Sequence, residues 1–170
     1  MAVTQRYIKR EEIVAFLNIG GSAADFEVIG NGQSTLTIEY NPETESEHYI
    51  VNALPTTIVD KYAPSFENEM KCIFGDPVFD YINEIRMGLK VGSDAESEVV
   101  LVDKYIKGSS ESSFRAQKFA CTLTIGKYGG DGGKTPTITY TVNLNGNPVE
   151  GEATIANGKA TFTEKQAQSA

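Results

Sequence analysis

Alternation of apolar and polar side chains is the feature of this sequence that most restricts its fold. Residues 118–125 and 137–144 alternate closely, and residues 35–40 and 66–74 follow the same pattern. A period of two places successive side chains on opposite faces of a strand. Threonine fills much of the polar phase, which is typical of an exposed sheet surface. The sequence therefore predicts a mainly β protein built from half-buried strands.

Turn signals separate these predicted strands. Asn157 and Gly158 stand between two apolar runs and predict a two-residue β-hairpin. Glycine-rich segments at residues 129–133 and 146–148 flank the strand predicted at residues 137–144. Strands joined by turns of this kind favour a β-sandwich or a β-barrel.

One segment has the spacing of a helix instead. Asp76 is a suitable N-cap, Pro77 suits the first helical position, and Gly88 or Gly92 can end the helix near residue 90. The apolar side chains of this segment repeat at helical spacing, at Val78, Ile82, Ile85 and Leu89. We therefore expect one α-helix over about residues 76–90, packed by its apolar stripe on the flank of the sheet.

The length of 170 residues predicts a single domain, over residues 1–164. Residues 1–10 are expected to form an N-terminal arm, residues 41–55 a long loop and residues 165–170 a flexible C-terminal tail. A short helix over residues 10–17 would join the arm to the domain. The sequence has no run of about 18 apolar residues and no secretion-signal pattern, so we expect production in the cytoplasm and no membrane partner.

The charge of the chain is unevenly distributed. The formal net charge is −8, and residues 11–60 contain nine acidic residues and no Lys or Arg. The first ten residues carry three positive charges, Arg6, Lys9 and Arg10. The acidic stretch has two interpretations. It is either a surface that only maintains solubility, or a surface that repels polyanions or binds a basic partner. A basic nucleic-acid footprint is absent.

Motifs for catalysis or for binding a cofactor or metal are incomplete. His48 is the only histidine, so a serine or cysteine nucleophile would lack its usual base. Residues 129–135 resemble the end of a phosphate-binding loop, but a strand is predicted to follow rather than a helix. Cys72 and Cys121 lie on the apolar phase of predicted strands and are expected to be buried free thiols. We expect no catalytic residue, no cofactor and no metal site, and hence no enzyme.

Several segments in fixed order resemble the tail tube proteins, or major tail proteins, of bacteriophages with long non-contractile tails that infect Gram-positive hosts. The resemblance covers about residues 5–164. Its segments are KREEIVAFLNIGG (9–21), EYNPET (39–44), GDPVFDYI (75–82) with Arg86, VGSDAE (91–96), GGDGG (129–133) and GNPV (146–149).

The resemblance implies a β-sandwich subunit that forms hexameric rings, which stack into a tube. Sheets of neighbouring subunits would join into one inner barrel, while arms and a long hairpin loop reach the next ring. The implied partners are further copies of the chain, a tape-measure protein and the tail terminator and distal tail proteins. DNA would pass transiently down the lumen. The implied location is the virion tail, assembled in the cytoplasm of a bacterial host, and the chain would lack the extra immunoglobulin-like domain of some relatives.

Two sets of charged residues are candidates for these contacts. An acidic lumen would repel phosphates, and the candidate lumen-facing acids are Glu39, Glu67 and Glu69. The candidate inter-ring contacts pair the basic arm with the acidic loop, namely Arg6, Lys9 and Arg10 with Glu43, Glu45 and Glu47. Two other classes of protein stay open: another virion β-sandwich, such as a tail terminator or capsid-decoration protein, and a carbohydrate-binding or adhesin module.

Overall fold

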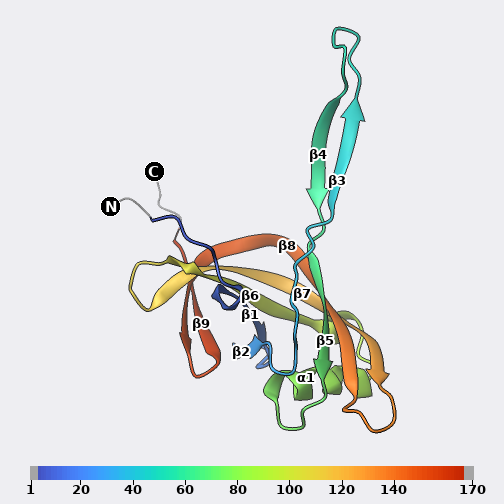
Figure 1. Cartoon of the computed structure of the whole chain (residues 1–170), viewed down its shortest axis with the longest axis vertical. Coiled ribbons are helices and arrows are strands. Elements are labelled where there is room, and N and C mark those ends of the chain that lie inside the picture. The colour runs from blue at the N-terminus through green and yellow to red at the C-terminus, as the bar shows by residue number, and fades with distance from the viewer. Residues whose placement is uncertain (1–3, 167–170) are drawn as a thin grey trace.

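A computed structural model describes residues 4–166 (Figure 1). The strands are β1 (Ile13–Asn18), β2 (Phe26–Ile29), β3 (Pro42–Glu47), β4 (Thr56–Tyr62), β5 (Ser65–Lys71), β6 (Glu96–Lys107), β7 (Ser113–Gly129), β8 (Thr137–Ala156) and β9 (Lys159–Glu164). Helix α1 spans Pro77–Met87, and two short 3-10 turns span Arg10–Glu12 and Gly92–Ala95. The mainly β prediction with one flanking α-helix is confirmed for the described residues.

The main sheet is antiparallel and closes on itself. Its strand order is β5-β8-β7-β6-β1-β2-β9, and β9 also pairs with β8. Six strands therefore form a closed barrel, and β5 is an additional strand beside it. Strand β8 is long enough to serve both parts, because residues 137–143 pair with β5 and residues 151–156 pair with β9.

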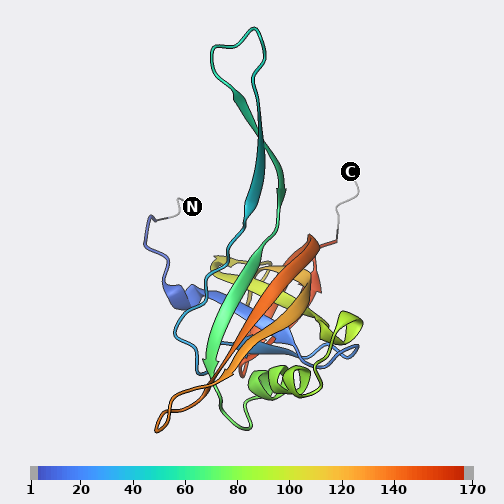
Figure 2. The ribbon, with the colours of Figure 1, turned by 90° about the vertical axis from the view of Figure 1, so that its right-hand side faces the viewer.

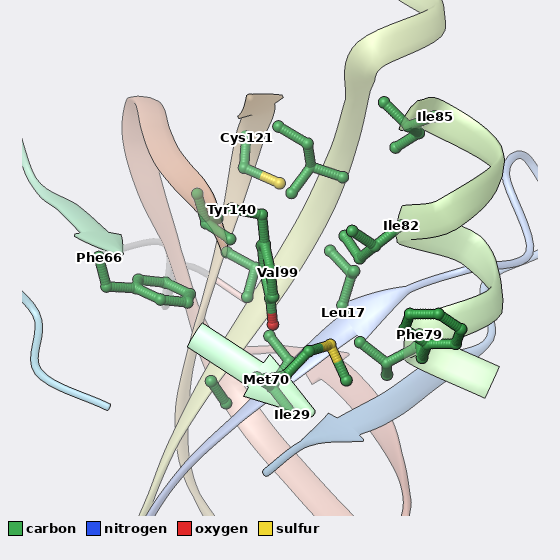
Figure 3. Close-up of a cluster of buried hydrophobic side chains, with 14 of the residues drawn as sticks. Leu17, Ile29, Phe66, Met70, Phe79, Ile82, Ile85, Val99, Cys121 and Tyr140 are labelled. Atoms are coloured by element: carbon green, nitrogen blue, oxygen red, sulfur yellow. The ribbon is translucent and has the colours of Figure 1, made fainter. Parts of the chain in front are cut away.

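Strands β1 and β6 lie between two apolar cores. Leu17 and Val99 face the core beneath α1, whereas Phe16 and Val100 face a second core inside the barrel. Both faces of these strands are buried. Residues 15–18 of β1 are therefore all buried, rather than alternating between buried and exposed. The core beneath α1 is the larger one, and it contains Tyr140, whose hydroxyl accepts a hydrogen bond from Gln33 Nε2 at 2.9 Å (Figure 3).

Helix α1 forms where its cap and apolar stripe predict it. The Asp76 carboxylate accepts a hydrogen bond from the Phe79 amide at 3.0 Å, and Pro77 is the first helical residue. Val78, Ile82 and Ile85 are buried against the sheet. The prediction is wrong at the other end, because the helix ends at Met87 and Leu89 is 82% exposed.

Two predictions near the N-terminus are wrong, one of a helix and one of a strand. Residues 10–17 form a 3-10 turn followed by β1 rather than a short helix, since the strand pairs with both β2 and β6. Residues 35–40 alternate in sequence but form only an isolated bridge, from Glu39 to Ser65. Leu36 and Ile38 still use their apolar phase, packing against the core as an extended segment.

One turn prediction is wrong, because residues 146–148 lie within β8, opposite a register shift in β7, rather than in a turn. The hairpin turn at Asn157 is confirmed, and the cysteine prediction holds in full only for Cys121. The Asn157 and Gly158 pair joins β8 to β9, and both residues have the positive φ that a two-residue hairpin requires. Cys121 is buried and Cys72 is half-buried, and both are free thiols. Burial raises the pKa of the Cys121 thiol to about 12. None of the helices in residues 4–166 is long and apolar enough to cross a membrane.

A long hairpin projects from the body of the molecule. The segment predicted as a loop over residues 41–55 is the first strand and the turn of this hairpin, which β3 and β4 form together (Figure 2). The arm has no helix or strand over residues 4–9, and residues 1–3 lie outside the described residues. The predicted C-terminal tail also lies outside them from residue 167 onward.

Candidate assembly surfaces

The β3–β4 hairpin exposes every one of its strand residues to solvent. An isolated two-stranded hairpin is at best marginally stable in water. Cross-strand contacts supply some support, because Lys61 Nζ lies 3.1 Å from Glu43 Oε2 and the Ser46 and Thr57 hydroxyls lie 3.1 Å apart. These side-chain contacts are few and solvent-exposed, so they add little to the stability of the hairpin.

The tip of the hairpin exposes apolar side chains, and the acidic residues of β3 precede it in the chain. Ile50 is fully exposed, and Val51 and Leu54 are more than three-quarters exposed. His48 Nε2 lies 2.9 Å from the Asn52 carbonyl oxygen across the turn, and Tyr49 donates a hydrogen bond to Glu47. We call residues 48–55 the hairpin tip. This exposed apolar cluster at the far end of a projection makes the tip a candidate interaction surface.

The N-terminal arm is tied to its own subunit. Arg6 makes a bidentate contact with Glu12, with N–O distances of 2.7 and 2.8 Å. This guanidinium, together with the Lys9 backbone amide, lowers the pKa of Glu12 to about 2. Arg10 donates to the backbone carbonyl oxygens of Ile13 and Leu36 at 2.6 and 2.8 Å. The structure therefore gives two of the three predicted arm contacts partners within the same chain.

The acidic loop residues have different surroundings from one another. Glu43 is paired with Lys61, and Glu47 accepts the Tyr49 hydrogen bond. Glu45 lies directly opposite Ile58 on the same face of the hairpin. The hairpin stands apart from the arm in both views, so the structure does not bring the predicted basic and acidic partners together within one chain (Figures 1 and 2).

The polar face of β5, β8 and β7 carries the other predicted acids. Glu67 lies opposite Thr141, and Glu69 lies opposite Thr139. Glu39 bridges to Ser65, which continues the same row of residues on β5. The structure thus brings the three candidate lumen acids onto one threonine-rich face, which it shares with Lys71 and Lys127 by the strand register.

This polar sheet region has two incompletely paired edges. In the described part of the chain, residues 123–129 of β7 pair with β8 alone, because the β6 ladder begins at Thr122. On the outer side of β5 the backbone is bonded only near its ends, to Glu39 and Gly32. Unpaired edges of this kind are templates for pairing with another chain.

A groove lies between the end of α1 and the incompletely paired edge of β7. It encloses about 650 Å³. The Arg86 guanidinium stacks on the Tyr128 ring at 3.9 Å and joins helix to strand. Leu89 and Val91 line the groove and are 82% and 78% exposed. We call this site the α1–β7 groove.

Sequence reasoning found some of these surfaces and missed others. The acidic residues predict the segment at 41–55 as a contact surface. The prediction does not include the apolar run from Tyr49 to Val51, although these three residues are consecutive in the sequence. Sequence reasoning also assigned Leu89 to the buried stripe of the helix, so the groove was missed. Groups of three or more His, Cys, Asp or Glu with metal-ligand geometry are absent from residues 4–166.

The fold is shared with a subunit of a tail assembly. A chain from the tail of an empty GTA particle, determined with C6 symmetry, aligns with a TM-score of 0.59 and 14% sequence identity. The alignment covers 85% of this chain and 98% of that one. A chain from the baseplate of the anti-feeding prophage also aligns, with a TM-score of 0.43, 10% identity and coverage of 87% and 95%, which is too distant to support an argument. No protein-family model and no curated protein matches this sequence.

Proposed function

We propose that this chain is a structural virion protein, the tail tube subunit of a long, non-contractile phage tail. It is not an enzyme but a building block that forms hexameric rings and stacks them into a tube. The observation that carries the proposal is the projecting hairpin with its exposed apolar tip, on a fold aligned over 85% of the chain with a subunit of a sixfold-symmetric tail.

Ring formation would use the two incompletely paired sheet edges. The outer edge of β5 in one subunit would pair with residues 123–129 of β7 in its neighbour, which extends the sheet from subunit to subunit. Closing such a sheet around six subunits removes every edge, as in a barrel. The proposal is supported by the placement of these edges on opposite sides of one three-stranded unit.

The threonine-rich face would line the lumen of the tube. Glu39, Glu67 and Glu69 would then give the wall negative charge near the passing duplex. DNA carries a negative charge roughly every 1.7 Å along its axis, so such a wall repels phosphates and allows sliding. Transient, non-specific passage of DNA requires this absence of binding. A tape-measure protein would occupy the same lumen before DNA enters.

Stacking would use the hairpin, which reaches beyond the body of its own subunit. The arm would contribute through Lys9 and the exposed Tyr7, because Arg6 and Arg10 are bonded within their own chain. Reversing the charge of Lys9 tests the arm's part, and tubes that form as before would remove the arm from the proposal. Tail terminator and distal tail proteins would bind the two open ends of the stack.

Electron microscopy of the purified, concentrated protein tests the function. We expect hollow tubes in negative stain, with sixfold symmetry in end views, and a hexamer or larger species by light scattering. A protein that stays monomeric at all concentrations would contradict the proposal. A stable trimer would favour a capsid-decoration protein, and binding in a glycan screen would favour a carbohydrate-binding module.

A further inference from the structure

The threonine-rich face has an ordered distribution of charge. Strand register divides this face of β5, β8 and β7 into rows that cross the three strands. Glu67 lies in one row with Thr141 and Thr124, so this row is acidic. Lys71 lies in another row with Thr137 and a glycine, so that row is basic.

A row of mixed charge lies between these two. Glu69 lies opposite Thr139, which in turn lies opposite Lys127, so the row contains one acid and one base. Beyond the acidic row, Glu39 bridges to the first residue of β5. The charge therefore changes from acidic to neutral to basic along β5, which runs from the base of the hairpin to the end of the molecule that carries α1 (Figures 1 and 2).

The charged side chains of these rows are available to a ligand. Within residues 4–166, the two glutamates and two lysines of the three rows are exposed and form no salt bridge. Glu96 of β6 adds a further exposed acid at the acidic end, because it lies opposite Thr122. In the turn beyond the basic row, Asp131 and Lys134 pair with each other at 3.4 Å. That turn therefore adds no net charge to the basic end.

A ring of subunits would turn each row into a band around the lumen. Sixfold symmetry places all copies of a residue at the same height. Glu67 and Lys71 are four residues apart in β5, which is about 13 Å along a strand. In a barrel whose strands tilt by about 40°, this corresponds to about 10 Å along the axis. The screening length is about 8 Å at physiological salt, so the acidic and basic bands act separately.

Such bands distinguish between two kinds of occupant. Duplex DNA has uniform negative charge along its length. A long duplex therefore meets acidic and basic bands together at every axial position, and it gains nothing by stopping at one of them. A protein whose acidic and basic segments alternate at the spacing of the bands gains attraction in one register and repulsion in the others.

We propose that the banded lumen binds an elongated protein with alternating acidic and basic segments and fixes its axial position against the rings. The acidic segments lie at Lys71 and Lys127, and the basic segments lie at Glu39 and Glu67. This inference rests on the proposed tube function and names the chemistry of the protein that fills the lumen before DNA enters. Each contact is exposed and weak, so affinity comes from repetition around and along the tube.

Two labelled helical peptides of equal composition test the pattern on wild-type tubes. The block peptide has one acidic and one basic segment whose centres lie about 10 Å apart, or about seven residues of helix. The scrambled peptide distributes the same residues evenly. In a co-sedimentation assay at low salt, we expect the block peptide to bind about tenfold more tightly, because only its charges match several bands at once. Added salt should release it.

Glu67→Gln combined with Lys71→Gln removes the bands at constant net charge. For tubes of this double variant, we expect the affinity for the block peptide to fall to that for the scrambled peptide. Glu84→Gln combined with Lys90→Gln is the matched control. It makes the same change at exposed residues in and after α1, which packs on the opposite face of the sheet, and should bind the block peptide as the wild type does.

The outcomes separate the two proposals. A wild-type chain that forms no tubes contradicts the tube function. Wild-type tubes that bind both peptides equally overturn the banded lumen alone, and this comparison decides even if the double variant does not assemble. The banded lumen is also wrong if the double variant binds the block peptide as tightly as the wild type, or if wild-type tubes retain duplex DNA more tightly than the block peptide.

Discussion

The ion pair between Arg6 and Glu12 fixes the direction in which the N-terminal arm leaves the domain. Glu12 also accepts the Lys9 amide at 2.8 Å, so one carboxylate holds both a side chain and the backbone of the arm. At the scale of single residues, the arm is therefore under electrostatic control. Its position should respond to acid through this one group.

The part of the arm that precedes Arg10 is expected to loosen as pH falls through the titration of Glu12, while the bonds from Arg10 to backbone carbonyls remain. The pKa of Glu12 is lowered from its ordinary value of 4.5 to about 2 by the Arg6 guanidinium and the Lys9 amide. A lowered folded-state pKa means that the contact is fully stabilising above about pH 4.5 and is lost as pH falls toward 2. NMR titration of the Glu12 carboxyl carbon measures this directly.

Arg6→Ala is the matched variant for that titration. It removes the largest cause of the shift, so the pKa of Glu12 should move back toward 4.5. Lys134→Ala removes an exposed ion pair with Asp131 in another loop and should leave the Glu12 titration unchanged. An unchanged pKa in Arg6→Ala would show that the arm is held by other contacts.

At the scale of elements, the cap of α1 makes contacts within its own subunit, whereas the tip of the hairpin is exposed. The cap stabilises its own subunit, because Asp76 satisfies the Phe79 amide and also accepts Asn31 Nδ2 at 2.9 Å. The tip is solvent-exposed and touches little of its own chain. Substitutions in the two elements should therefore separate folding from assembly.

Asp76→Ala should lower the free energy of unfolding by about 0.5–2 kcal/mol, the usual range for a lost N-cap. The Phe79 amide and the Asn31 side chain both lose their acceptor. Urea denaturation followed by circular dichroism measures the change. Asp76→Asn, which keeps an accepting oxygen, should lose much less, and equal losses would argue against a capping role.

Ile50→Ser combined with Val51→Ser should leave the subunit folded and prevent tubes. Both side chains are exposed, so the expected change in unfolding free energy is within about 0.5 kcal/mol. Sedimentation velocity and negative stain measure assembly. Asn52→Ser, in the same turn, is the control and should assemble normally. Tubes of normal length from the double variant would contradict a role for the hairpin tip in stacking.

At the scale of the whole molecule, the direction of the sheet and the direction of the hairpin determine what can be assembled. In the proposed tube, the two incompletely paired edges would allow growth around a ring. The hairpin would allow growth along the axis of that tube, because it projects away from the body of its own subunit. The threonine-rich face would line the lumen of the proposed tube.

Charge reversal on that face should convert a non-binding channel into a binding one. For Glu67→Lys combined with Glu69→Lys, we expect short duplex DNA to co-sediment with tubes at low salt and to be released as salt rises. Wild-type tubes should retain none. Glu111→Lys combined with Glu164→Lys makes the same charge change on exposed residues elsewhere and should not retain DNA. Equal retention by both variants would show that the face does not line the lumen.

Periodicity and local chemistry determined much of the fold in advance. The alternating strands at residues 118–125 and 137–144, the Asp76 cap and the Asn157 turn depend on neighbours in sequence, so the sequence alone predicts them. The same local signals placed Glu67 and Glu69 on the polar phase of one strand. They also selected the acidic segment at residues 41–55 as a feature apart from the core.

Tertiary structure alone decided the remainder, because alternation defines the faces of a segment and not its partners. Residues 35–40 alternate like a strand yet leave the ladder, since the edge of β5 bonds to them only through Glu39. Leu89 continues the apolar spacing of α1, but the left-handed turn after Gly88 directs it outward. The closure of β9 on β8 and the projection of the hairpin likewise depend on contacts between residues distant in sequence, which local patterns do not encode.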